Sequence, residues 1–188
     1  MADEPAMFRP GEPGQEREFR HALGMFATGV AIVTGTQPGG RHFGMTINSF
    51  VAISLHPPLV GWSLSHTAPS AAAFSTATHF AVNILASNQV ELSRRFSRPG
   101  EDRFAGTAVH VGEHGLPLID GAAAYFECRR EHQFPAGDHV ILVGAVERCS
   151  YRRANTLVFS QGRYHGGVAA ELTSPRPLDE DSEWEGIA

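Results

Sequence analysis

The chain has 188 residues, of which 42% are hydrophobic and 19% charged, a composition typical of a folded protein rather than a disordered one. Its formal net charge is −5 and its 15 Lys and Arg residues are scattered, which argues against a nucleic-acid partner because phosphate backbones are bound by a concentrated basic face. No apolar run reaches the roughly 18 residues of a membrane span, and residues 1–15 lack the apolar stretch of a secretory signal, so we expect a cytoplasmic protein with no membrane partner.

The two ends of the sequence differ in composition from its middle. Residues 1–14 are rich in Pro, Gly and charged residues, and residues 171–188 contain an acidic run at 179–181. We expect an N-terminal arm over 1–14, a single folded domain over 15–170 and an acidic C-terminal tail over 171–188.

The first predicted element is a helix over residues 16–28. Phe19, Ala22, Leu23 and Phe26 recur at helical spacing, and Gly29 can end the helix. The chain then becomes rich in β-branched and aromatic residues, interrupted by Pro and Gly. This pattern predicts three strands, the first two joined as a hairpin, over residues 30–33, 45–54 and 59–65.

Short helices and further strands are predicted for the rest of the domain. The alanine-rich segment 69–77 favours a helix, as does 88–96, where Asn88 or Ser87 can cap the N-terminus and Glu91 can complete a capping box. Strands are predicted over residues 80–85, 122–133, 139–152 and 156–160. Many strands with few helices and no βαβ alternation favour a mainly β fold, a barrel with flanking helices.

The cysteine and histidine spacings favour neither a disulfide nor a metal site. Cys128 and Cys149 both lie in predicted strands, where we expect buried free thiols. His110 and His114 have helical ligand spacing, but the glycines around them disfavour a helix and no Asp or Cys completes a ligand set. We expect no bound metal.

No glycine-rich dinucleotide motif, phosphate-binding loop or serine-nucleophile motif occurs in the chain, so chemistry has to be sought in other polar stretches. The first is Gly44–Phe50, where short hydroxylated residues alternate with apolar ones. It fits either a strand with one polar face or the lining of a flat heteroaromatic ring, which needs many hydrogen bonds and little bulk.

A second polar stretch, Ser63–Ser70, gathers hydroxyl groups where a strand runs into a helix. These side chains fit helix capping, and they equally fit a phosphate held at the helix N-terminus. A third stretch holds Asn83 in an apolar strand, followed by Ser87 and Gln89. A buried amide such as that of Asn83 needs partners, which a structural hydrogen bond or a ligand can provide. His139 stands alone at the start of a strand, where it could reach a cleft.

Taken in order, these stretches resemble the flavin reductase-like, FMN-binding split-barrel family, the reductase components of two-component flavin-dependent monooxygenases. The resemblance extends from about residue 19 to residue 166. It rests on Phe19–Val30, Gly44–Thr46 with Ser49–Phe50, Ser54–Leu55 with Pro57–Val60, Phe80–Leu85 with Gln89, Arg95–Phe96, Asp102–Gly106, Gly137–His139 and Gly162–Tyr164.

The resemblance implies a mainly β, six-stranded Greek-key split barrel that forms a homodimer, with flavin in a groove near the subunit interface. It also implies a role for individual positions. The isoalloxazine ring would face Met45, Thr46, Asn48 and Ser49, with the lining continued by Ser63, Leu64 and Ser65. Ser70 and Arg95 would bind the phosphate, and Asn83, Ser87 and Gln89 would contact the ribityl chain or ring edges. His139, the catalytic candidate, would border the nicotinamide together with Tyr164.

The implied activity is hydride transfer from NADH or NADPH to FMN or FAD, which supplies reduced flavin to a partner monooxygenase. The main alternative is a flavin-binding electron-transfer or carrier module that does not oxidise NAD(P)H. A same-fold oxidase acting on a pyridoxine phosphate is disfavoured by the few Lys and Arg around the expected groove, and an all-β interaction domain would not bind flavin at all.

Overall fold

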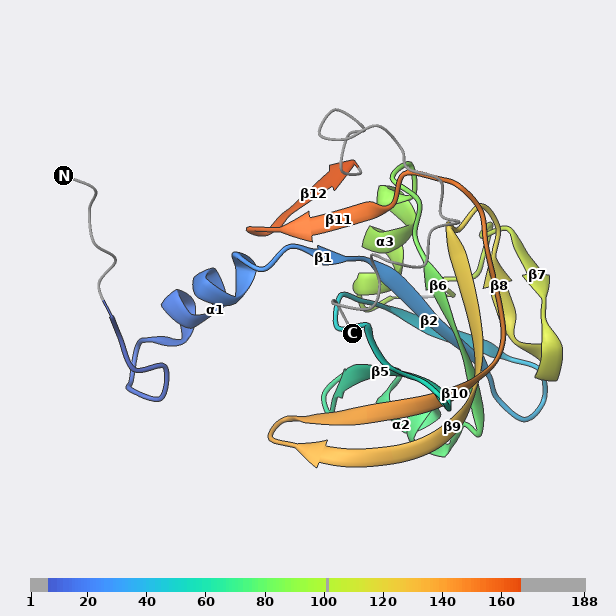
Figure 1. The fold of residues 1–188 in the computed structure, drawn as a ribbon, viewed down its shortest axis with the longest axis horizontal. Helices are drawn as coiled ribbons and strands as arrows, with labels where there is room; N and C mark the ends of the chain where they lie inside the picture. Colours follow the sequence, from blue (N-terminus) through green and yellow to red (C-terminus); the bar gives the residue numbers. More distant parts are fainter. Residues whose placement is uncertain (1–6, 101, 167–188) are drawn as a thin grey trace.

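The computed structural model describes residues 7–100 and 102–166, which form a mainly β protein with three α-helices and one short 3₁₀ helix (Figure 1). None of these helices is long and apolar enough to cross a membrane. The helices are α1 (Glu16–Gly24), α2 (Ala71–Thr76), α3 (Val90–Ser97) and the 3₁₀ helix η1 (Glu113–Gly115). The strands are β1 (Thr28–Gly29), β2 (Ala31–Thr36), β3 (His42–Ile47), β4 (Val51–Leu55), β5 (Pro58–Ser65), β6 (His79–Ile84), β7 (Val109–Val111), β8 (Pro117–Ile119), β9 (Ala124–Ala136), β10 (His139–Tyr151), β11 (Leu157–Ser160) and β12 (Arg163–Gly166).

Seven antiparallel strands form the main sheet, in the order β3-β2-β6-β9-β10-β5-β4. Two smaller sheets, β1-β11-β12 and β7-β8, complete the described part of the chain. The expected hairpin is present as β2 and β3, whereas the single strand expected over 45–54 is two strands. Residues 48–50 leave the strand conformation there, and β4 pairs with β5 at one edge of the seven-stranded sheet. The sheets have open edges, which fits a split barrel.

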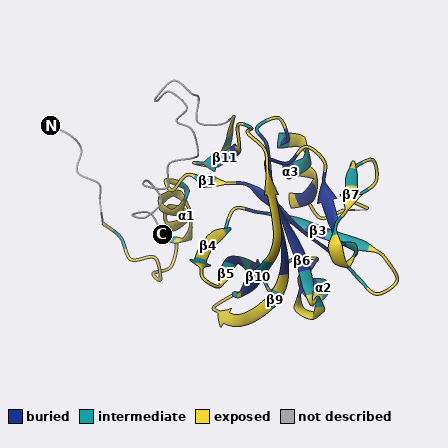
Figure 2. Cartoon of the chain, turned by 45° about the vertical axis from the view of Figure 1, so that its right-hand side comes forward, coloured by how far each residue is buried: buried dark blue, intermediate teal, exposed yellow. Residues whose placement is uncertain are grey.

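The core lies where the apolar faces of the main sheet meet α2 and α3 (Figure 2). Trp62 of β5 packs edge-on against Phe74 of α2 and Phe80 of β6, with ring centroids 4.9 and 5.8 Å apart. A second cluster holds Phe96 of α3 and Leu157 of β11 against the start of β2. Burial of these large side chains fixes both helices on the sheet.

Helix α1 is shorter than expected and its apolar stripe is not covered by the described chain. It ends at Gly24 instead of residue 28, and no residue within it is buried. Phe19 and Leu23 are 42% and 58% exposed, and Figure 1 shows the helix extending away from the sheets. An amphipathic stripe without an internal partner indicates an interaction surface.

Helix α3 begins differently from the expected capping box. Its N-cap residue is Gln89, no side chain caps the first turn, and Glu91 pairs with Arg94 at 2.6 Å. The Gln89 side chain closes the preceding turn instead: its Oε1 accepts from Ala86 N at 3.0 Å and its Nε2 donates to Asp120 O at 2.9 Å. The capping-box prediction was therefore wrong.

Both cysteines are free, but only one is buried. Cys128 in β9 is completely enclosed, and burial raises the pKa of its thiol to about 12. Cys149 is exposed because the C-terminal part of β10 extends beyond the core, so the expectation of a buried thiol was wrong at that position.

Candidate functional site

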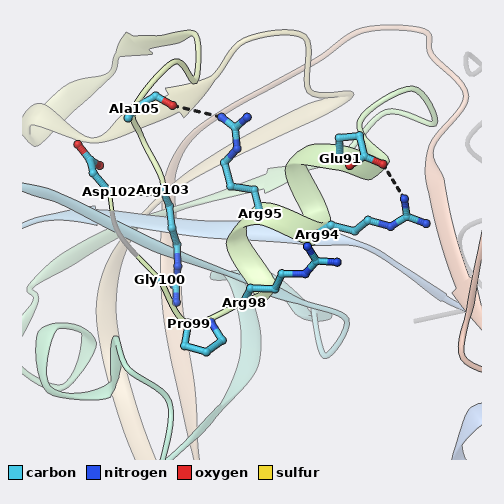
Figure 3. A pocket seen from close by; sticks show the side chains of 9 residues that line it. All are labelled: Glu91, Arg94, Arg95, Arg98, Pro99, Gly100, Asp102, Arg103 and Ala105. Carbon is cyan, nitrogen blue, oxygen red and sulfur yellow. Dashed lines mark hydrogen bonds and ion pairs between the residues drawn. The ribbon is translucent and has the colours of Figure 1, made fainter.

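An arginine cleft lies between α3 and the loop that follows it, with a volume of about 420 Å³. Arg94, Arg95 and Arg98 lie along α3, and Arg103 lies on the facing loop (Figure 3). One Glu and one Asp share this lining, so four guanidinium groups outnumber two carboxylates. Such a cleft attracts phosphate groups, because a guanidinium presents several N–H donors to anionic oxygens.

Two of these arginines are held in place by the backbone. Arg95 Nη1 donates to Ala105 O at 3.3 Å and to Thr107 Oγ1 at 3.1 Å, while Arg103 Nη1 donates to Gly44 O at 2.7 Å. Arg94 is paired with Glu91, and its guanidinium carbon also lies 5.7 Å from the ring centroid of Tyr164. The cations are thus positioned before any anion binds, which reduces the entropy lost on binding.

The arginine cleft adjoins a β3 groove of about 640 Å³, bounded by β3, the start of α2, and residues 100 and 102–104. Gly100, Asp102 and Arg103 line both cavities. Ser70 also lines the groove, where its Oγ lies 3.5 Å from Gly44 O. The predicted phosphate residues Ser70 and Arg95 therefore belong to two connected cavities that share Arg103.

Thr46 and Tyr164 are joined through a residue that the sequence did not indicate. Thr46 Oγ1 donates to Ser93 O at 2.7 Å, and the Ser93 hydroxyl lies 2.9 Å from the Tyr164 hydroxyl. Ser93 is buried in α3 and connects β3 with β12. Ser93 lies in the helix predicted over residues 88–96, but no motif or spacing in the sequence indicates that it connects two strands.

A second group of predicted residues meets where β5 pairs with β10. The Ser49 hydroxyl accepts from Ser63 N at 3.0 Å, and Ser65 stands opposite His139 in the strand register. His139 Nδ1 lies 2.7 Å from Asp138 Oδ1, and this hydrogen bond holds the pKa of the Asp138 carboxyl below its usual value. The imidazole is 41% exposed and oriented by its neighbour.

Other predicted positions have mainly structural contacts. The Asn83 side chain is fully buried: Nδ2 donates to Ile32 O at 2.9 Å and to Thr34 Oγ1 at 3.1 Å, and Oδ1 accepts from Ile119 N at 2.8 Å. Gln89 is 7% exposed and closes the turn before α3. These contacts leave the Asn83 amide no surface for a ligand in this structure.

The remaining predicted positions differ in exposure. Leu64 is a core residue, and Met45 packs against the same cluster. Ser87 is half-buried and its backbone N–H donates to Asn155 O at 2.8 Å, whereas Asn48 is exposed beyond the end of β3. The structure thus gathers the predicted residues along β3, β5 and α3 without bringing all of them to one cavity.

A flavin reductase-like domain model matches residues 23–167, which includes almost all of the described sheets. The chain belongs to the flavin reductase-like domain family. The arginine cleft, the β3 groove and the β5–β10 group all lie inside the matched segment.

Relatives of this flavin reductase-like chain include reductases and reductase components. FMN reductase (NADH) SmoA of Agrobacterium fabrum is 47% identical over 154 residues, covering 81% of this chain and 87% of the relative. The reductase component of flavin-dependent trigonelline monooxygenase of Acinetobacter baylyi is 42% identical over 148 residues. That match covers 79% of this chain but 48% of the relative, so the chain spans about half of its length.

Solved structures of the family have the same fold. The NADH:FAD oxidoreductase SgcE6 of Streptomyces globisporus C-1027, solved in complex with NAD and FAD fragments, superimposes with a TM-score of 0.78 at 33% identity. The superposition covers 82% of this chain and 93% of SgcE6. This chain thus shares its mainly β architecture with SgcE6, whose structure contains bound NAD and FAD fragments.

Proposed function

We propose that this chain is an NADH:flavin oxidoreductase that reduces FMN or FAD and delivers the reduced flavin to a partner monooxygenase. The observation that most supports this function is the arginine cleft, which shares Gly100, Asp102 and Arg103 with the adjoining β3 groove. Four guanidinium groups suit a phosphate or pyrophosphate, and a cavity of this size suits the rest of a flavin nucleotide. The names of SmoA and SgcE6 favour NADH over NADPH as the hydride donor.

The flavin would extend from the arginine cleft along β3. Arg103, Arg95 and Ser70 would hold the phosphate, and the short side chains of Thr46, Asn48 and Ser49 would lie beside the ring. Bound NADH would supply the hydride and the bound flavin would accept it together with one proton from water. The work of the chain is to bind and orient the two rings.

We also propose that His139 orients the nicotinamide. Its imidazole is fixed by Asp138 and stands at the β5–β10 edge beside Ser65. An oriented N–H group there can hydrogen bond to a carboxamide oxygen, and Ser65 would border the same ring, whereas Tyr164, predicted for this place, lies beside Ser93 and Arg94. No residue forms a covalent bond to either ring in this mechanism.

A homodimer is part of the proposal. In α1 and the segment after it Phe19, Leu23, Met25 and Phe26 are 42–77% exposed, and in β4 the side chains of Val51, Ile53 and Leu55 are 48–74% exposed. Large apolar groups at this exposure gain stability when a second copy covers them. We propose that these two surfaces form the dimer interface of a Greek-key split barrel.

The partner and the compartment are inferred from the same family. The trigonelline relative is named as the reductase component of a monooxygenase, so reduced flavin is its product for another protein. We propose the same relationship here, with an oxygenase as acceptor. The free thiols of Cys128 and Cys149 favour the reducing cytoplasm as the place of action.

Arg98→Ala tests whether the arginine cleft takes the phosphate of the flavin. Arg98 lines the arginine cleft and is exposed at the end of α3, so its truncation removes one cation with little effect on the core. A hydrogen bond to a charged group contributes about 1.5–3 kcal/mol, so at this exposed site we expect about tenfold weaker FMN binding. Riboflavin has no phosphate and should bind the variant and the wild type alike.

The matched control is Arg153→Ala, which removes an exposed arginine outside both cavities. Fluorescence quenching of each flavin titrated with protein gives the dissociation constants. Equal loss of FMN and riboflavin affinity, or an equal effect of the control, would reject the cleft as the phosphate site.

A further inference from the structure

Three potential metal ligands from separate segments meet on the surface of the main sheet. His79 is the first residue of β6, His114 lies in η1 and Glu147 lies in β10. His114 Nε2 and His79 Nε2 lie 3.5 and 3.8 Å from Glu147 Oε2, and the three ligand atoms are all within 4.8 Å of one another. The two imidazole rings face each other with centroids 3.8 Å apart.

We propose that His79, His114 and Glu147 form a binding site for one divalent transition-metal ion, with Zn²⁺ the best match to these ligands. Two imidazole nitrogens and one carboxylate oxygen are a ligand set that Zn²⁺ uses when a fourth position is left to water. Tetrahedral coordination at about 2.0–2.1 Å places neighbouring ligand atoms about 3.3 Å apart. The distances of 3.5 and 3.8 Å to Glu147 Oε2 are close to this value, and because the two imidazoles are stacked, both rings would rotate until their Nε2 lone pairs converge on the ion.

Neighbouring groups direct the free ligand atoms toward the ion position. Arg129 Nε lies 3.3 Å from Glu147 Oε1, which leaves Oε2 to face the histidines. His79 Nδ1 lies 3.0 Å from the Thr78 hydroxyl, a contact that can fix the tautomer with a lone pair on Nε2. Metal-bound histidines and carboxylates commonly have such outer partners, which orient the ligand and tune its basicity.

The charge around the three residues is compatible with a cation. Arg129 is the nearest positive group, and it is itself paired with Glu131 at 2.7 Å as well as with Glu147. Glu147 therefore keeps a carboxylate oxygen whose closest partners are two imidazoles. A divalent ion bound by all three side chains would replace the two contacts in which His79 and His114 approach the same oxygen, Glu147 Oε2.

The loop that presents His114 is anchored to the sheet. The backbone N–H of Glu113 donates to the buried carboxylate of Glu127 at 2.6 Å, and Gly112 N donates to Leu116 O at 2.8 Å. His114 itself adopts a φ of 54°, a left-handed conformation that is uncommon for residues other than Gly. A fixed loop places its imidazole over β6 and β10 without the ion.

The ion would join β6, β10 and η1, and none of its three ligands lines the arginine cleft or the β3 groove. Its role is therefore to stabilise the fold rather than to take part in hydride transfer. The spacing of His110 and His114 did not indicate this cluster, because His110 pairs with Asp120 at 2.7 Å and the other two ligands lie far along the chain.

Calorimetric titration of untagged, chelator-treated full-length protein with ZnCl₂ tests the site. We expect one ion per chain, with affinity lowered roughly tenfold or more in His114→Ala and in Glu147→Gln. Both side chains are at least one-third exposed, so the variants should fold. His110→Ala is the matched control, since it removes another exposed, carboxylate-paired histidine nearby and should bind Zn²⁺ like the wild type.

Two further measurements separate this site from binding elsewhere. Co²⁺ should give the visible absorption of a low-coordinate nitrogen and oxygen site in the wild type and in His110→Ala, and lose it in the two site variants. Zn²⁺ should also raise the melting temperature of the wild type and of His110→Ala, and leave those of His114→Ala and Glu147→Gln unchanged. Absence of binding to the wild type, or binding that His114→Ala and Glu147→Gln leave unchanged, would overturn the proposal.

Discussion

The buried amide of Asn83 joins three segments of the chain. Its two groups hydrogen bond to Ile32 and Thr34 in β2 and to Ile119 at the end of β8. Asn83→Ala would leave several of these buried groups without partners, at a cost of about 1–3 kcal/mol in the free energy of unfolding. Urea denaturation measures the loss, and Asn88→Ala, at an exposed position in the nearby turn, should change stability little.

The effects of Asn83→Ala on stability and on flavin affinity decide between a structural role and a ligand-binding role for this residue. Loss of stability with unchanged flavin affinity in the folded variant would support the structural role. Unchanged stability with lost flavin affinity would contradict it and restore the ligand contact implied by the family resemblance.

The pair formed by Asp138 and His139 gives a pH-dependent prediction. Its hydrogen bond to His139 lowers the pKa of Asp138 from 3.8, so the folded state favours the charged carboxylate. The stabilising contribution is present above pH 3.8 and is lost as the pH falls through the lowered folded-state pKa. His139→Ala should therefore return the pKa of Asp138 toward its ordinary value, as measured by NMR titration of the carboxyl carbon.

The same His139→Ala variant also tests the proposed nicotinamide role. Turnover of NADH should fall while the affinity for FMN stays nearly constant, because the residue would touch only the donor. A variant with wild-type turnover would remove His139 from the site, whatever the titration shows.

Part of the site could be predicted from the sequence because some of its residues belong to a recognisable local pattern. Ser70 lies in the hydroxyl-rich stretch before a predicted helix and Arg95 was indicated by the family resemblance, and each lines one of the two adjoining cavities. Ser93 and Arg103 have no such local signal. Their importance comes from contacts to Thr46 and Gly44 across the fold, which no spacing along the chain reveals.

At the scale of elements, strands with strong apolar periodicity were predicted well and their ends less well. Segments 80–85 and 59–65 correspond closely to β6 and β5. The break between β3 and β4 was missed because the alternation of Asn48 and Ser49 with apolar residues fits the polar face of a strand, although Asn and Ser also favour turns. The three-residue strands β7 and β8 are too short to give a periodic signal.

Helix α1 and strand β4 provide the element-scale prediction. Leu23 and Leu55 are 58% and 74% exposed, so a charge at either position should not disturb the core. If these surfaces meet a second copy, Leu23→Asp or Leu55→Asp should convert the dimer into a monomer, because a buried unpaired carboxylate is costly. Sedimentation velocity measures the mass in solution.

Val111→Asp is the control for that experiment. Val111 is 66% exposed in β7, on a different element, and its replacement should leave the dimer intact. A monomeric wild type, or dissociation by the control as readily as by the two interface variants, would contradict the proposed interface.

At the scale of the whole molecule, the family resemblance seen in the sequence is confirmed by the domain match over residues 23–167. Motifs spread over most of the chain, in a fixed order, indicate a fold more reliably than any one of them indicates a contact. Residues 1–6 and 167–188, which include the first six residues of the expected arm and the whole acidic tail, lie outside the described residues. The expected tail therefore stays a prediction.

The central claim is that this chain transfers a hydride from NADH to flavin. Anaerobic stopped-flow mixing of NADH with protein and FMN, and separately with FAD, tests it without interference from oxygen. We expect the visible absorbance of at least one flavin to bleach with loss of one NADH per flavin reduced, far faster than without protein. Flavin that binds the protein but keeps its colour after mixing with NADH would contradict the reductase and favour a flavin carrier.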